Sequence, residues 1–218
     1  MPVAPGGLRE RNKRDKHDRI VAAARRLFRR QGFERTTTQQ VAAEAGIGAG
    51  TLFLYARTKE DLLVMVFLLE LSRVVDDSFE TLDGAAPLLD QLLHLYDAVS
   101  RHHARNLALG RPFAKELMFV HEARRPAMRA FMAGWMRRIA EVIERARQHG
   151  EIDAGADARL LATSTFAQFF FRLQSWLGGY ITRARLEAEL RDALRLTLAG
   201  ATLHRRPGRR NRSKTTKR

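Results

Sequence analysis

The sequence predicts an all-α protein with a small N-terminal helical domain followed by a larger one. Apolar residues recur every three to four positions along nearly the whole chain, which is the spacing of an amphipathic helix. No stretch alternates apolar and polar residues with the Val, Ile and Thr enrichment of strands. Glycines and prolines interrupt the periodic segments and divide the 218 residues into about nine helices.

Two helices are expected first. One runs from about Asp15 to Gln31, and Gly32 ends it. Thr37 is placed to cap a second, shorter helix over residues 38–45. Gln40 follows three residues later, so the two side chains can satisfy the free amides at the helix start as a capping box.

A glycine turn and a third short helix follow. Gly46 ends the second helix, the third continues through Tyr55, and Thr58 with Asp61 repeats the capping pattern at the start of a fourth. Two short helices joined by a glycine turn and packed on a longer first helix meet the requirements of a helix-turn-helix. The second of them must then reach the major groove of DNA.

The rest of the chain is expected to hold further helices. Gly110 with Pro112 is expected to break the chain, Pro126 lies in the first turn of a helix that ends near Gly150, and Asp157 is placed to cap the next. The other expected spans are Leu62 to Phe79, Leu88 to Asn106, Phe113 to Glu122, Ala158 to Leu177 and Arg185 to Leu203.

The net charge of +15 is concentrated at the two ends of the chain. Residues 1–60 hold 13 Lys or Arg against 6 Asp or Glu, residues 61–203 are balanced, and residues 204–218 hold 8 basic residues and no acidic one. Such asymmetry suits a polyanion such as nucleic acid, because phosphate attraction needs no particular base sequence. Solubility, or a genome that favours arginine, is the alternative explanation.

These observations predict four segments along the chain. The arm could enter a minor groove or be merely solvated, and the tail could add non-specific DNA affinity or only solubility. The segments are a basic flexible arm (1–14), a helix-turn-helix DNA-binding domain (15–60), a larger domain (61–203) and a disordered basic tail (204–218).

Several classes of protein are disfavoured. No window reaches the roughly 18 apolar residues of a membrane span, and no secretory signal is recognisable, so a cytoplasmic protein is expected. The absence of cysteine excludes disulfides and thiolate metal sites.

No phosphate loop, Gly-x-Gly-x-x-Gly, His-Glu-x-x-His or Gly-x-Ser-x-Gly motif is present. His102 and His103 are adjacent and therefore point to different helix faces. We expect no catalytic residue, metal or cofactor.

The run from Thr36 to Leu63, TTTQQVAAEAGIGAGTLFLYARTKEDLL, resembles the signature of the TetR family of transcriptional regulators. The resemblance implies a dimeric bacterial repressor that binds DNA through residues 37–55. By position, Thr37, Tyr55 and Lys59 resemble phosphate contacts of the family, and the base edges would be read mainly from the third helix. The DNA-contacting residues that the resemblance implies are Thr37, Thr38, Gln39, Ala49, Gly50, Thr51, Phe53, Leu54, Tyr55 and Lys59.

The run departs from the family pattern at four positions. Gly48 stands where Ser is usual, Phe53 where Tyr is common, Leu54 where His is frequent and Ala56 where Phe is frequent. The third helix therefore lacks a side-chain cap, and its outward surface is apolar. Such a surface predicts contact with thymine methyl groups and positioning by phosphates, with modest sequence specificity.

The resemblance also implies a ligand chamber and a two-fold dimer interface in the larger domain. A mostly apolar chamber predicts a hydrophobic effector, although most aromatic residues at helical spacing belong to the core. Candidate chamber residues are Phe113, Met118, Phe119, Phe131, Trp135, Phe166, Phe170, Gln174 and Trp176. Candidate interface residues, which could instead face the subunit's own core, are Leu161, Thr165, Phe169, Leu173, Leu186, Leu190, Leu194 and Leu198.

The function expected from these features is transcriptional repression. A homodimer would bind a palindromic double-stranded DNA operator on the nucleoid and would be released by a small-molecule effector. A non-specific nucleic-acid-coating protein is the alternative, but it would leave the charge-balanced half of the chain without a purpose. A helical enzyme is a third possibility, and an activator or a ligand-independent repressor also fits the sequence.

Overall fold

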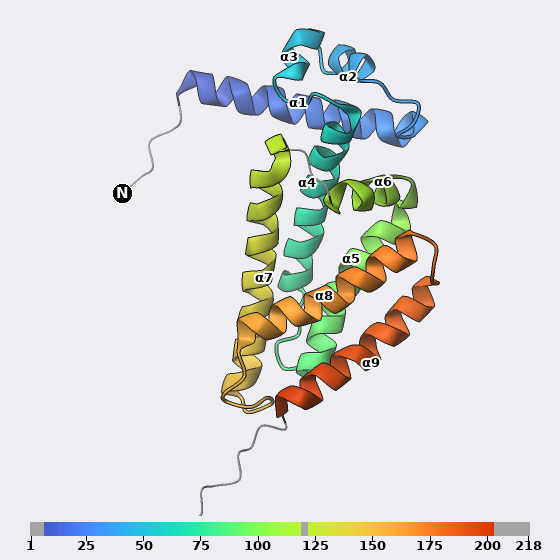
Figure 1. Ribbon diagram of the computed structural model, residues 1–218. Coiled ribbons are helices and arrows are strands. Elements are labelled where there is room, and N and C mark those ends of the chain that lie inside the picture. The colour runs from blue at the N-terminus through green and yellow to red at the C-terminus, as the bar shows by residue number, and fades with distance from the viewer. Residues whose placement is uncertain (1–6, 119–121, 203–218) are drawn as a thin grey trace, which may run out of the picture.

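The computed structural model describes residues 7–118 and 122–202, and this part of the chain is helical without strands (Figure 1). The all-α prediction is confirmed. The helices of the described residues are α1 (Leu8–Gln31), α2 (Thr38–Glu44), α3 (Ala49–Phe53), α4 (Lys59–Glu80), α5 (Leu88–Arg105), α6 (Leu107–Met118), the short 3-10 helix η1 (Glu122–Arg124), α7 (Arg125–Gln148), α8 (Ala158–Leu177) and α9 (Arg183–Thr202).

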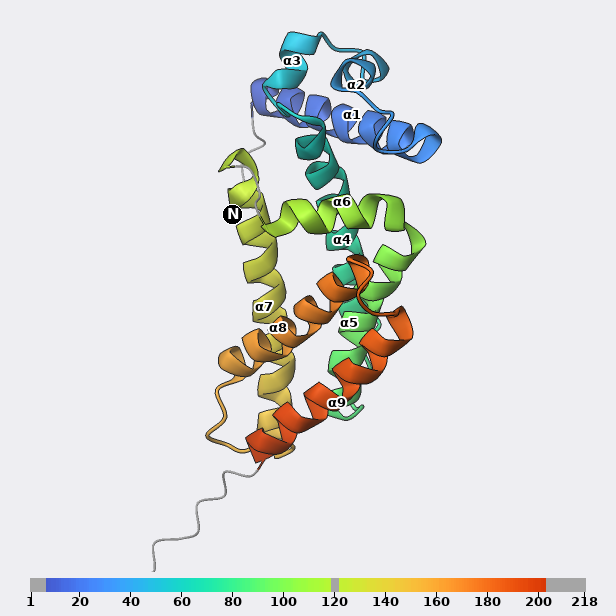
Figure 2. The same cartoon turned by 45° about the vertical axis from the view of Figure 1, so that its right-hand side comes forward.

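The helices form two regions joined by α4. Helices α1, α2 and α3 gather at one end, and α4 runs from them into a larger helical body (Figure 1). In both views α8 and α9 lie side by side along one side of that body, and α9 ends far from α2 and α3 (Figure 2). This arrangement places α3 at an outer end of the molecule, where it can approach a long partner such as DNA.

The small domain is held by apolar residues from all of its helices. Ile20 and Leu27 of α1, Val41 of α2 and Leu52 of α3 are buried in one cluster that continues into Leu62 of α4. Both predicted capping boxes are present, one formed by residues 37 and 40 and one by residues 58 and 61. The cap at residue 157 is confirmed as well, because its carboxylate accepts from two amides at the start of α8.

Helix α1 begins seven residues earlier than expected, so the segment 8–14 is helical and not a flexible arm. No glycine or proline lies between Gly7 and Gly32, and the intervening Arg, Lys and Glu residues favour helix. Every side chain from Arg9 to Arg19 is exposed. The N-terminal part of α1 is therefore a charged helix that extends beyond the packed core, as Figure 1 shows. Residues 1–6 and the predicted tail lie outside the described residues.

The expected break at Gly110 and Pro112 is wrong, because both residues lie inside α6. The chain turns at Asn106, whose φ of −144° and ψ of 59° are non-helical. A proline inside a helix removes one hydrogen bond but does not forbid the helix. Gly110 serves close packing, since a Cβ there would lie 3.1 Å from the His103 ring.

Candidate DNA interface and effector cavity

The turn between α2 and α3 depends on a glycine and an arginine. Gly46 has φ of +63°, a left-handed conformation that side chains with a Cβ rarely adopt. Arg19 of α1 donates from its guanidinium to the carbonyl oxygens of Ala45 at 2.5 Å and Gly46 at 3.0 Å. A Cβ on Gly46 would lie 2.7 Å from that guanidinium. Arg19 thus fixes the turn to α1. The sequence does not reveal this role, because Arg19 and Ala45 lie 26 residues apart in the chain.

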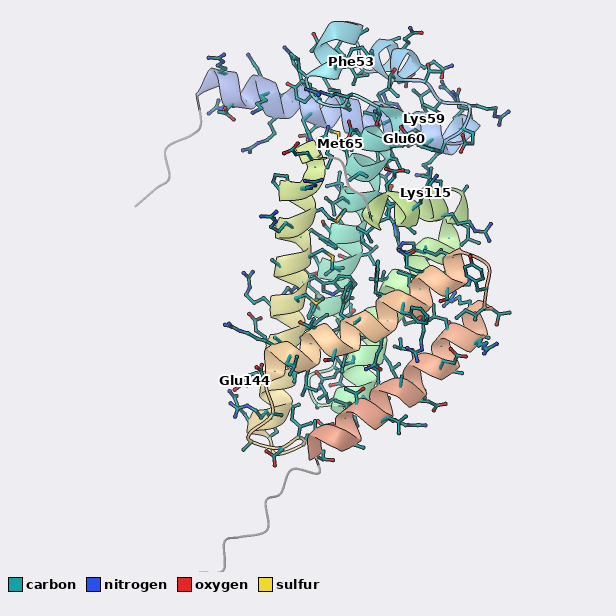
Figure 3. All side chains as sticks on the ribbon, viewed as in Figure 1. Phe53, Lys59, Glu60, Met65, Lys115 and Glu144 are labelled. Atoms are coloured by element: carbon teal, nitrogen blue, oxygen red, sulfur yellow. The ribbon has the colours of Figure 1, made fainter. Side chains whose placement is uncertain are left out.

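The ten residues expected to contact DNA are all accessible. None is buried, and Phe53 and Leu54 are 51% and 84% exposed although both are apolar. Figure 3 shows Phe53 at the outer end of the small domain. Exposed large apolar side chains on this short helix fit the predicted contact with thymine methyl groups, because such a contact would remove apolar surface from water. Their DNA roles stay predictions.

Two of these residues are held by neighbouring elements. The Tyr55 hydroxyl donates to the backbone oxygen of Lys13 at 3.4 Å, which ties the end of α3 to the extended part of α1. The Lys59 ammonium donates to the backbone oxygen of Glu34 at 3.1 Å and lies 4.4 Å from the centre of the Phe33 ring. Lys59 is thus fixed beside the α1–α2 loop at the start of α4.

The third helix has the weakest start in the small domain. Gly48 is its N-cap residue, and no side chain caps it. Ala56 lies three residues after the end of α3 and is 1% exposed, so this small residue is packed in the core and is not part of the outward surface. The five-residue α3 is held mainly by Leu52, which is buried.

Ion pairs connect the small domain to the larger body. Arg25 of α1 lies 2.6 Å from Glu70 of α4, and the His102 ring of α5 lies 3.9 Å from the same carboxylate. Asp61 at the start of α4 is buried and lies 3.6 Å from Arg124, the residue before α7. Side chains of α1, α5 and the start of α7 thus meet carboxylates of α4.

A small, mostly apolar cavity lies in the larger body between α4, α5, α6, α7 and α8. Its open volume is about 20 Å³, little more than the space of one water molecule. Six of the predicted chamber residues line it, namely Phe113, Phe131, Trp135, Phe166, Phe170 and Gln174. Trp176 does not line it, nothing is described of the Met118 side chain, and Phe119 lies outside the described residues. Lining residues that the sequence prediction did not assign to the chamber include His103, Met128 and Phe169.

The cavity has few polar groups, and two of them have partners in the protein. Gln174 donates its side-chain amide to the backbone oxygen of Ala114 at 3.2 Å. The Nδ1 atom of His103 lies 3.0 Å from the backbone oxygen of Val99, which can only accept, so Nδ1 carries the proton. Burial lowers the pKa of His103 to about 4, and its ring is therefore neutral at neutral pH.

The predicted dimer residues of α8 and α9 face inward. Seven of the eight are buried within the subunit, and Leu161 is half-buried. Thr165 bonds to Tyr96 at 2.9 Å, and Phe169 stacks on the Tyr96 ring at 4.7 Å. For these seven residues the structure shows the alternative that the sequence left open, which is burial in the subunit's own core. The opposite faces of the two helices carry the exposed Leu160, Phe171 and Leu196.

Within the described ranges, no helix is long and apolar enough to cross a membrane. The same part of the chain contains no group of three or more His, Asp or Glu side chains that could hold a metal ion.

Residues 20–66 match the family described as "Bacterial regulatory proteins, tetR family". Over 172 residues the chain is 24% identical to the fatty acid metabolism regulator protein of Bacillus subtilis (strain 168), covering 77% of this chain and 86% of that protein. Over 180 residues it is 26% identical to the transcriptional regulator AcuR of Cereibacter sphaeroides, covering 78% and 77% respectively.

Solved structures share the fold. Thermus thermophilus FadR, a TetR-family repressor in complex with lauroyl-CoA, matches with a TM-score of 0.69 and 25% identity over 88% of this chain and 98% of that one. Bacillus subtilis FadR in complex with stearoyl-CoA matches with a TM-score of 0.64 and 22% identity over 84% of this chain and 98% of that one. The likeness therefore extends through the larger helical body as well as the helix-turn-helix.

Proposed function

Because the chain belongs to the TetR family of transcriptional regulators, we propose that it represses transcription as a homodimer on a palindromic operator and is released by an acyl-CoA thioester. The observation that carries the DNA-binding part is the exposure of α3. Its outward residues are free, while Gly46 and Arg19 fix the turn that presents it. Two recognition helices of a dimer would enter successive major grooves about 34 to 36 Å apart. Such a protein would act in the cytoplasm, on the nucleoid.

The proposed dimer contact uses the outward faces of α8 and α9. Leu160 and Phe171 on α8 and Leu196 on α9 are 64%, 71% and 76% exposed, which is unusual for such large apolar side chains. The two helices lie side by side, and Gln168 of one donates to Thr197 of the other at 2.7 Å. Together they offer one continuous surface for a two-fold contact, in which each copy uses the same patch.

The proposed effector class rests on the cavity and on the relative solved with lauroyl-CoA. The lining is mostly aromatic and aliphatic, as an acyl chain requires. Ligand pockets usually measure about 300 to 1,000 Å³, so a cavity of about 20 Å³ must widen before a chain can enter. An effector that fits only a widened cavity would shift the population of the protein towards the widened state.

Widening the cavity would move the helices that carry the DNA-binding unit. Leu71 of α4 and Met128 of α7 both line the cavity. Helix α4 continues directly into the small domain, and Arg124 at the start of α7 pairs with Asp61 at the start of α4. A displacement of either helix thus changes the separation of the two recognition helices in the dimer, which lowers operator affinity.

The test is release of bound operator, measured by fluorescence anisotropy with DNA selected by the protein from a random pool. Lauroyl-CoA should lower the operator affinity at least about tenfold, while coenzyme A alone should not. Thr51→Arg should abolish binding and leave the helical circular dichroism unchanged, because Thr51 is only partly buried. Operator binding that is indifferent to every acyl-CoA of about 4 to 18 carbons would contradict the effector class. Loss of helicity in Thr51→Arg would instead assign that residue a structural role.

A further inference from the structure

One polar group in the effector cavity has no partner. Trp135 lies on α7, lines the cavity and is 4% exposed. Its Nε1 atom is buried and has no hydrogen-bond partner in the part of the chain that the structure describes. Buried indole N–H groups nearly always find an acceptor, because leaving the donor unpaired costs the hydrogen bond that water would have made.

The described surroundings of Trp135 are mainly aromatic rings. Its ring packs edge-on against Phe166 at 5.3 Å, and against Tyr96 and Phe169 at 6.4 Å each. Aromatic faces are only weak acceptors for an N–H group. The Tyr96 hydroxyl, the only oxygen that these three rings carry, is hydrogen-bonded to Thr165 at 2.9 Å and makes no bond to the Trp135 indole N–H. A phenylalanine at position 135 would leave no donor unpaired, although its smaller ring would fill less of the space.

We infer that the effector presents an oxygen acceptor to the Trp135 indole N–H, and that this oxygen is a hydroxyl or keto group on the acyl chain. This inference rests on the proposed acyl-CoA function. The CoA part carries charged phosphates that an apolar cavity cannot hold, so the thioester next to it lies towards the rim. Trp135 packs against Tyr96 and Phe169, which are 0% and 1% exposed, and we therefore take it to meet the acyl chain beyond the thioester.

The unpaired donor makes Trp135 a specificity-determining residue. An unsubstituted chain that widens the cavity would leave the N–H unpaired, whereas an oxygen-substituted chain pairs it. His103 adds to the preference, because its Nδ1 is the donor and its Nε2 is therefore an acceptor on a ring that lines the same cavity. A hydroxyl group can use both kinds of partner, and a methylene group can use neither.

The test compares octanoyl-CoA with its positional hydroxy isomers by isothermal titration calorimetry. One isomer should bind wild type at least about tenfold more tightly than octanoyl-CoA does. Trp135→Phe should reduce that ratio to within about twofold. Trp176→Phe, the matched change at the chain's other tryptophan, should keep it, because Trp176 does not line the cavity. Equal affinity of wild type for all isomers, or an unchanged ratio in Trp135→Phe, would overturn the inference.

A second measurement keeps this result separate from the proposed effector class. The two indole N–H signals in ¹⁵N–¹H spectra can be assigned with the same two variants and followed during titration with phenol and with benzene. The Trp135 signal should move downfield with phenol and not with benzene, because only phenol carries an acceptor. If no acyl-CoA binds but this response appears, the effector class is wrong and the inference about an oxygen acceptor holds. A Trp135 signal that responds equally to both probes would overturn the inference even if acyl-CoA binds.

Discussion

Removing three basic side chains from the extended part of α1 should weaken the salt dependence of operator binding. Arg9, Lys13 and Lys16 are exposed and are spaced four and three residues apart, so they share one face of the helix. The Tyr55 hydroxyl bonds to the Lys13 backbone oxygen at 3.4 Å, which places this stretch next to the recognition helix. We expect the three side chains to lie along DNA phosphates when α3 enters the groove.

The size of the effect follows from counterion release. Each phosphate neutralised contributes about −0.9 to the slope of log affinity against log salt concentration. Three side chains in each of two subunits make six contacts, so the triple change to Gln should reduce the slope by about 5. The slope is measured by fluorescence anisotropy of operator binding between roughly 50 and 300 mM salt, a range over which the screening length changes by about 2.5-fold.

A matched control separates phosphate contact from a general loss of charge. Changing Arg137, Arg145 and Arg191 to Gln removes the same charge from exposed positions on α7 and α9, and the slope should stay within about 1 of wild type. Equal reductions in the two triple variants would mean that only net charge matters. An unchanged slope in the α1 variant would refute the placement of α1 along DNA.

Three further predictions concern stability and assembly. Because the pKa of His103 falls from 6.5 to about 4 on folding, the unfolded chain binds the proton first, and stability should fall by about 2 kcal/mol between pH 7 and pH 5. In urea unfolding, the free energy of unfolding should depend less on pH in His103→Gln than in wild type. Identical pH profiles of the two proteins would contradict the lowered pKa of His103. Gly46→Ala should cost at least about 1 kcal/mol in thermal unfolding, since φ is +63° and the new Cβ meets Arg19; an unchanged midpoint would argue against the turn described. Leu196→Glu should give folded monomers in sedimentation experiments, whereas Leu194→Glu, at a position that is 0% exposed, should unfold the subunit; a stable Leu196→Glu dimer would place the interface elsewhere.

The DNA-binding unit could be predicted in detail because its signals are local. Capping boxes act over three residues, and a glycine turn followed by a short helix is visible in one window. Both capping boxes and the outward position of the recognition residues could therefore be derived from the sequence. The start of α1 could not be derived from the sequence, because a highly charged segment without helix breakers is compatible with both a solvated arm and a continuous helix.

The structure of the larger domain was harder to predict from the sequence, because the contacts that determine it join residues far apart in the chain. The leucine stripe on α9 predicts a buried face, but period alone does not say whether that face meets the same subunit or a second one. The contact between Tyr96 and Thr165 spans 69 residues and turns the stripe of α8 inward. Gly110 shows the same limit, because a glycine that breaks a helix and one that lets His103 pack closely look alike in sequence.

The central claim is that exposed α3 reads an operator as part of a symmetric dimer. The most direct test is to select genomic DNA fragments with the purified full chain at about 150 mM salt, near physiological ionic strength. The account predicts that one inverted repeat is enriched, with half-site centres about one helical turn apart or a multiple of it. Salt-sensitive binding without any enriched sequence would contradict the account and would favour a protein that coats nucleic acid non-specifically.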